Sequence, residues 1–177
     1  MQYLAANPGL RSLIAAPPNA TLLYAGDTAQ NNPWKESTPV YRKLQTMKLT
    51  EPSLSQKKTL NDVLGTLSAP GTKFPSLLAY AEHVDQQVRE DGAGPAERML
   101  VWRALSGIYA SNARGAVSFL LGDGVSREAL KVFALTEIHV LERNRGVDSI
   151  TREMVAYLKT CVLTHKADIR IGLIRNV

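Results

Sequence analysis

One carboxylate interrupts an otherwise apolar stripe in the second half of the chain, and it belongs to Glu137. The spacing of apolar residues predicts one helix from Ser126 to about Arg143. Its inward-facing side chains would be Leu130, Phe133, Ala134, Glu137, Ile138 and Leu141. Burial raises the pKa of a carboxyl group, and many catalytic acids arise in this way. We therefore weigh an acid/base role for Glu137 against the commoner structural alternative, in which a cation or solvent satisfies the carboxylate.

The segment before this helix combines a strand with a glycine-rich turn. Ala116 to Leu121 is typical of a strand, and Gly122-Asp123-Gly124 follows it as a sharp turn. Backbone N–H groups at such a turn can hold a phosphate. A plain turn is the favoured interpretation, because the third glycine of a dinucleotide fingerprint is missing and Asp123 would repel an anion.

These residues define the candidate site of a small enzyme that acts on a nucleotide or another phosphate-bearing substrate. Glu137 would be its acid or base, while Asp27 and Arg103 would position the substrate. Tyr24 and Asp123 would contribute to binding, because the cleft would lie between the end of the Tyr24 strand and the glycine turn. A toxin or effector of this kind is the second of two function classes that we consider.

A metal site is not expected. His139 and Glu142 are three residues apart and can share a helix face, but no third ligand accompanies them. A helix turns Glu137 away from His139 by about 200°. If the segment were a strand instead, those two side chains would share a face. We predict no metal and no bound cofactor.

The first function class is an interaction or regulatory domain that binds a protein partner. Trp34 follows Asn31-Asn32-Pro33 in a polar loop, and an exposed tryptophan is typical of a binding surface. Arg143 and Arg145 are further candidate binding residues. Their alternative role is structural, because basic side chains followed by Gly146 are typical of a helix end.

One short run resembles a known family. Leu22-Leu23-Tyr24-Ala25-Gly26-Asp27-Thr28 is similar to the first strand of toxin-type ADP-ribosyltransferases, which runs apolar-Tyr-Arg-x-Asp-Ser/Thr. In that family the arginine holds the dinucleotide, and here Ala25 stands in its place. The resemblance implies an NAD-dependent transferase with Glu137 as its catalytic glutamate. It covers seven residues, and the family's later Ser-Thr-Ser strand is not apparent.

Proline opens several of the expected helices, at a position where its missing N–H is not needed. Helices should begin near Pro8, Pro39, Pro75 and Pro95. The last of these, extending to Ser111, is apolar on most sides and is predicted to be the central buried helix. Further helices are expected over residues 55–67 and 150–163, and strands over residues 21–25, 116–121 and 169–174.

These elements predict a helix-rich α+β fold with a small mixed sheet of about three or more strands. We expect one domain over residues 1–177, because neither half has enough apolar elements for a core of its own. A hinge near residues 90–94, where Asp91-Gly92-Ala93-Gly94 divides the chain, is the alternative.

Composition limits the partners and the compartment. The chain has 177 residues, a net charge of +5 and one cysteine. The positive charge is scattered, so nucleic acid is not an expected partner, and we expect a protein partner, with a small nucleotide as the alternative. No apolar run is long enough to span a membrane. A single cysteine suits a soluble protein in a reducing compartment, either cytoplasmic or delivered into a cytosol, and secretion of a longer precursor stays open.

Overall fold

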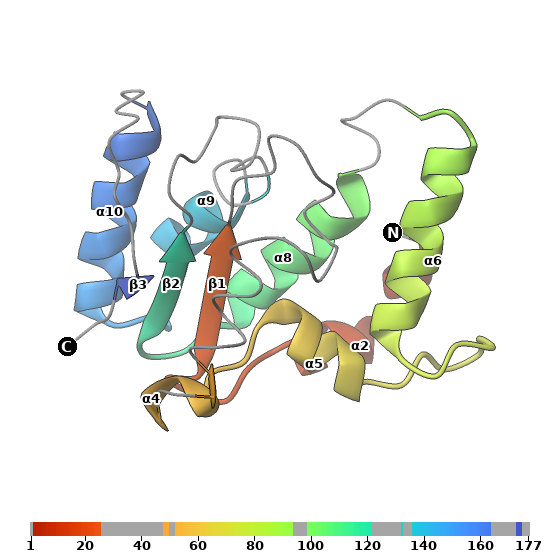
Figure 1. Ribbon diagram of the computed structural model, residues 1–177, viewed down its shortest axis with the longest axis horizontal. Coiled ribbons are helices and arrows are strands. Elements are labelled where there is room, and N and C mark those ends of the chain that lie inside the picture. The colour runs from red at the N-terminus through yellow and green to blue at the C-terminus, as the bar shows by residue number, and fades with distance from the viewer. Residues whose placement is uncertain are drawn as a thin grey trace.

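The computed structural model describes residues 2–25, 48–49, 52–93, 99–121, 132, 136–163 and 173–174. In the view of Figure 1, the elements follow from left to right as helix α10, a small sheet, helix α8 and helix α6. The fold is helix-rich and α+β, as the sequence predicts.

The sheet is built on two parallel strands, β1 (Thr21–Ala25) and β2 (Val117–Leu121). Their register runs from Thr21 opposite Val117 to Ala25 opposite Leu121, so both strands end at the same edge. Strand β3 (Leu173–Ile174) adds only two residues, which pair antiparallel with Leu120 and Phe119 of β2. The structure therefore confirms a small sheet, but it does not confirm the predicted number of about three or more strands. Parallel strands need a long crossover, and here helices occupy it.

The described helices have the following bounds: α1 (Gln2–Ala6), α2 (Pro8–Leu13), α4 (Pro52–Ser55), α5 (Leu60–Thr66), α6 (Leu77–Glu90), α8 (Leu100–Asn112), α9 (Ile138–Arg143) and α10 (Ser149–Leu163). None of them has the length and apolar composition that crossing a bilayer requires. Helix α1 was not expected from the sequence. The predicted helix at Pro39 and the hinge residue Gly94 lie outside the described residues.

Local hydrogen bonds decide where two of the helices begin. Of the helix predicted over residues 55–67, the structure has α5 over Leu60–Thr66 and only the last residue of α4. A capping box starts α5 at Thr59: its side chain accepts from the Asp62 N–H while the Asp62 carboxylate accepts from the Thr59 N–H. Helix α6 begins at Leu77 rather than at Pro75, because the Ser76 hydroxyl accepts from the Ala79 N–H.

Helix α8 is the central buried helix that the sequence predicts. Trp102, Leu105 and Tyr109 are all buried, and Tyr109 is fully enclosed. The Tyr109 hydroxyl donates to the Lys58 carbonyl oxygen, which also accepts from the Leu22 N–H of β1. One cluster of buried apolar residues extends from Leu4 to Leu158 and includes these side chains. The division of the chain into domains nevertheless stays a prediction.

A compact set of contacts aligns the amino ends of β1 and β2. Gly115 has φ of +68°, and a Cβ there would lie 2.1 Å from Asn19 Oδ1. The Asn19 Oδ1 accepts from the Ala116 N–H at 2.8 Å, and the Asn19 N–H donates to the Arg114 carbonyl at 2.9 Å. Only glycine fits this backbone conformation and this space without strain. Helix α8 therefore ends at the amino edge of the sheet, and its first residues lie on the side toward which the strands point (Figure 1).

Candidate functional site

Glu137 lies in a π-type turn with Thr136, immediately before α9. Turns of this type inside helices are frequent at functional sites. The predicted helix from Ser126 is described only at residue 132 and from residue 136 onward. In that part the predicted inward face is confirmed: Glu137 is 6% exposed, and Ile138 and Leu141 are buried. His139, Glu142 and Arg143 are exposed on the other face.

The buried position changes the acidity of Glu137. Burial raises the pKa of its carboxyl group to about 8, and a hydrogen bond with the Ser106 hydroxyl opposes this increase. Among the described residues no ion pair involves Glu137. At neutral pH the carboxyl group is therefore mostly protonated, and it can donate a proton to a bound molecule.

Arg103 of α8 lies beside this turn. Its Nε donates to the Thr136 Oγ1 at 3.1 Å, and its side chain is half-buried. Ser106 follows Arg103 by three residues, so both lie on neighbouring positions of one helix face. The structure thus brings Glu137 and Arg103, which are 34 positions apart in sequence, into one group with Ser106 and Thr136.

Gly107 sets the distance between α8 and the Glu137 turn. A Cβ at this position would lie 3.2 Å from the Thr136 Cγ2, which is tighter than ordinary van der Waals contact. The glycine therefore lets the backbone of α8 approach Thr136 closely. This approach places the Ser106 hydroxyl within reach of the carboxyl group.

Within the Glu137 group, Arg103 is the residue nearest to the beginning of α8. The Tyr109 hydroxyl and the Leu22 N–H at the amino end of β1 both donate to the Lys58 carbonyl. Arg103 lies six residues before Tyr109, or about 9 Å away along the axis of α8. Helix α8 begins on the side where β1 and β2 end (Figure 1). Arg103 is the fourth residue of this helix. Burial raises the pKa of the Tyr109 hydroxyl, and the carboxyl groups of Asp62 and Glu137 add to this increase.

Other predicted site residues are not part of this group. Asp27, Trp34 and Asp123 lie outside the described residues, so their predicted roles stay predictions. Tyr24 is half-buried in β1, in register with Leu120 of β2. It is the next-to-last residue of β1 and so lies close to the carboxyl end of that strand.

The remaining candidates lie on the outer side of α9 and beyond its end. Arg143 and Arg145 are both exposed. The Glu142 carboxylate accepts from the Lys159 Nζ at 2.8 Å through each oxygen, and this lysine lowers the pKa of Glu142. Across the described ranges, His, Cys, Asp and Glu side chains form no group of three that could hold a metal ion.

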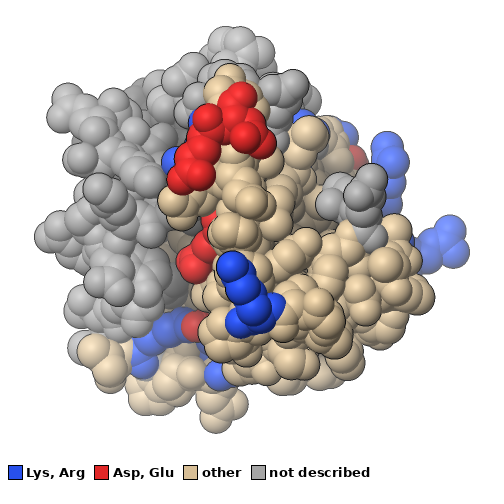
Figure 2. Space-filling model, turned by 90° about the vertical axis from the view of Figure 1, so that its right-hand side faces the viewer, with Lys and Arg blue, Asp and Glu red and all other residues tan. Residues whose placement is uncertain are grey.

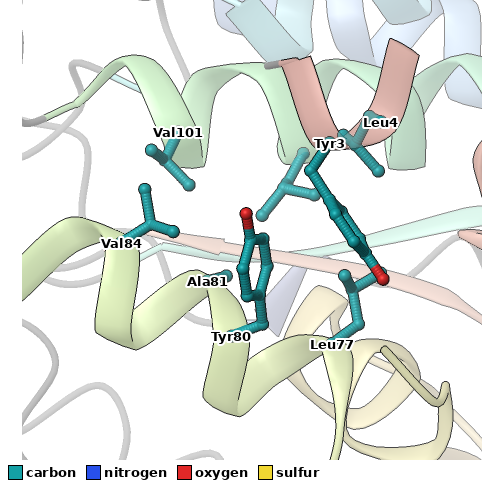
Figure 3. A pocket seen from close by; sticks show the side chains of 8 residues that line it. Tyr3, Leu4, Leu77, Tyr80, Ala81, Val84 and Val101 are labelled. Atoms are coloured by element: carbon teal, nitrogen blue, oxygen red, sulfur yellow. The ribbon is translucent and has the colours of Figure 1, made fainter. Parts of the chain in front are cut away.

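A pocket lies on the opposite face of α8, between α1, α6 and α8 (Figure 3). Its lining is mostly apolar and consists of Tyr3, Leu4, Leu77, Tyr80, Ala81, Val84, Val101 and Leu105. Val101 and Leu105 point to one side of α8, while Arg103 and Gly107 point roughly the other way at about 100° per residue. Glu137 does not line this pocket. The rings of Tyr3 and Tyr80 contact each other inside it, with centroids 4.5 Å apart.

On the side of the molecule that carries α6, the charged side chains of the described residues lie at separate places. Figure 2 shows acidic side chains near the end of α6 and basic side chains at separate places, with broad uncharged surface between them. This distribution agrees with the scattered charge of the sequence.

Sequence reasoning missed Ser106, Thr136 and Gly107. Ser106 and Gly107 interrupt the apolar sequence of α8 between Leu105 and Ile108. A small and a polar residue at buried helix positions are the signal that could have identified them. Comparison of the chain with protein-family models, with curated proteins and with solved structures found no match.

Proposed function

We propose that this chain is an enzyme in which Glu137 acts as a general acid on a substrate that carries an anionic group. The observation that carries the proposal is the burial of the Glu137 carboxyl beside the Ser106 hydroxyl, without an ion-pair partner among the described residues. A carboxyl group that stays protonated at neutral pH is suited to proton donation, whereas an ordinary surface glutamate is not.

The position of Arg103 is the reason for proposing an anionic substrate. Its Nε donates to Thr136, which fixes the orientation of the guanidinium, and no hydrogen bond to a described residue occupies the terminal nitrogens. A guanidinium held in this way suits a phosphate or carboxylate, which it can bind through two parallel hydrogen bonds. We therefore favour a nucleotide or another phosphate-bearing molecule as the substrate.

The place of the group in the fold supports the same proposal. In open sheets with parallel strands, ligands bind near the carboxyl ends of the strands. Both β1 and β2 end at one edge, and α8, which carries Arg103, begins on that side (Figure 1). Asp27 and Asp123 follow β1 and β2 in the sequence by two residues each.

A ligand screen followed by activity assays tests the proposal. Thermal unfolding is measured with mononucleotides, dinucleotides and sugar phosphates, because a specific ligand raises the unfolding temperature. A ligand that stabilises the protein should fail to do so in Arg103→Ala, whereas exposed Lys73→Ala should respond like the wild type. Glu137→Gln should still bind the ligand but should no longer convert it to product. A screen without hits, or equal turnover in Glu137→Gln, would contradict the proposal.

Binding of a protein partner is the second candidate function. It is favoured by Arg143 and Arg145, which are exposed beyond the apolar face of α9. Trp34, the other residue on which this expectation rests, lies outside the described residues. A pull-down with Trp34→Ala that retained every partner would count against a role for that loop.

A further inference from the structure

We infer that the surface around the end of α8 binds an acidic segment of a protein partner. We call it the arginine surface, and it consists of Arg11, Leu13, Arg114, Arg143 and Arg145. All five side chains are exposed. The inference deepens the second candidate function and is independent of Glu137, because none of these five residues belongs to the Glu137 group.

Hydrogen bonds and close packing bring the segments that carry these residues together at the end of α8. The Asn112 Nδ2 at the end of α8 donates to the Arg11 carbonyl at 2.7 Å and to the Ile14 carbonyl at 3.1 Å. The Arg114 side chain lies over Gly146, where a Cβ would be 2.6 Å from the Arg114 Cδ. The backbone of Arg11 is therefore bonded to the last residue of α8. Arg145 directly precedes Gly146, which packs against Arg114 just beyond that helix end.

The segment that carries Arg143 and Arg145 is held rigidly. The Asn144 Nδ2 donates to the carbonyls of Ala110, Ser111 and Ala113 at 2.9 to 3.1 Å. The Asn144 Oδ1 accepts from the Gly146 N–H at 2.8 Å, and the Gly115 N–H donates to the Gly146 carbonyl at 2.8 Å. A rigid segment loses less conformational entropy when its side chains bind a partner.

The positive charge of this surface is not neutralised by the described residues. None of the four arginines forms an ion pair with another described residue. The nearby acids are engaged elsewhere: Glu142 pairs with Lys159, and the Asp148 Oδ1 accepts from the Thr151 N–H. Arg114 Nη1 donates to the carbonyls of Ser111 and Ala113, so part of its capacity serves the helix end. Arg11, Arg143 and Arg145 are left as the main donors to a partner.

Leu13 gives the surface an apolar centre. It is 55% exposed, and the two carbonyls that Asn112 fixes belong to residues on either side of it, Arg11 and Ile14. An exposed leucine among arginines matches the composition of protein interfaces, in which apolar side chains and arginine occur together. A partner segment with glutamate or aspartate around one apolar residue would complement it.

A protein segment fits this surface better than a nucleic acid. Single-stranded nucleic acids are held by basic grooves with aromatic side chains for base stacking, and none of the five residues is aromatic. Arginine pairs with carboxylates through two hydrogen bonds, which suits a short acidic segment.

Fluorescence anisotropy with labelled probes tests the inference. The probes are a short peptide in which glutamates flank a leucine, the same peptide with glutamine for glutamate, and single-stranded DNA of equal length. The wild type should bind the acidic peptide and not the glutamine peptide. Arg143→Glu and Arg145→Glu, whose side chains make no hydrogen bond to the described residues, should each weaken binding about tenfold. Arg11→Glu and Leu13→Ala should also weaken it.

Lys73→Glu is the control, because it changes the net charge equally at an exposed position in the segment before α6. It should leave peptide affinity unchanged. The inference is overturned if Lys73→Glu weakens binding as much as Arg145→Glu, if DNA binds more tightly than the peptide, or if the acidic peptide does not bind. Thermal unfolding of each variant shows that a loss of binding does not come from a loss of folding.

Discussion

The Arg103 Nε donates to the Thr136 Oγ1 at 3.1 Å, and this bond joins the beginning of α8 to the residue immediately before Glu137. It crosses between segments that are 33 residues apart in the chain. The bond fixes the guanidinium beside the turn in which the buried carboxyl group lies. A defect in this contact should therefore affect both the packing of α8 on α9 and the orientation of the guanidinium.

Thr136→Val should destabilise the protein by about 1 kcal/mol, because valine keeps the shape of threonine but offers no acceptor to the half-buried Arg103. Chemical denaturation measures this change. Thr66→Val is the control, since the Thr66 hydroxyl only donates to the Val63 carbonyl of its own helix and Thr66 is exposed. Equal stability losses in the two variants would show that the hydrogen bond between Arg103 and Thr136 does not contribute to the free energy of unfolding.

Glu137 should make the protein less stable as the pH rises. Its pKa increases from 4.5 to about 8 on burial, so between these values the folded protein retains a proton that the unfolded chain has released. In this window the contribution of Glu137 to stability should fall by about 1.4 kcal/mol for each pH unit. Denaturation at several pH values should therefore show a smaller decline in Glu137→Gln than in the wild type.

Glu142→Gln is the matched control for this measurement. Glu142 is exposed and its pKa is lowered by Lys159, so its contribution is present at neutral pH and is lost only in acid. Above pH 5 this variant should follow the slope of the wild type. A Glu137→Gln variant with that same slope would show that the carboxyl group is already ionised in the folded protein.

Gly115→Ala should destabilise the protein more than Gly71→Ala. Both glycines have positive φ, +68° and +74°, so both substitutions carry the strain of a left-handed conformation, about 1 to 2 kcal/mol. At Gly71 a Cβ meets nothing within 4 Å, whereas at Gly115 it would overlap the Asn19 side chain that aligns the strands. Equal unfolding temperatures for the two variants would contradict the account of the strand ends.

Tyr109→Phe should cost about 1 kcal/mol of stability, because it removes a buried hydrogen bond to the Lys58 carbonyl, which keeps the Leu22 N–H as a donor. Tyr3→Phe removes an exposed hydrogen bond from the Tyr3 hydroxyl to the Pro70 carbonyl and should cost less. Both losses are measured by urea denaturation. A larger loss of stability in Tyr3→Phe than in Tyr109→Phe would contradict this prediction.

Periodicity predicts the parts of this fold that depend on local pattern. The apolar sides of α8 identify it as the central helix, and the stripe through Ile138 and Leu141 places Glu137 inside. Proline is a weaker guide to helix starts, because side-chain caps at Thr59 and Ser76 decide where α5 and α6 begin.

Contacts between distant segments are not encoded in any local pattern. Ser106 becomes a partner of Glu137 only because Gly107 lets α8 approach Thr136, and neither spacing nor composition predicts that approach. The sequence predicts that Arg103 could position a substrate, but its bond with Thr136 depends on the same packing. The arginine surface likewise combines α2, the end of α8 and the segment after α9, which only the folded chain brings together.

Direct titration of the Glu137 carboxyl group by NMR is the measurement that bears most closely on the proposed function. The side-chain carboxyl carbon, assigned by comparison with Glu137→Gln, is followed as the pH increases. The structure predicts a midpoint near 8, which corresponds to an acid that is still protonated at neutral pH. A midpoint close to the ordinary value of 4.5 would contradict it, because an ionised Glu137 could not donate the proton.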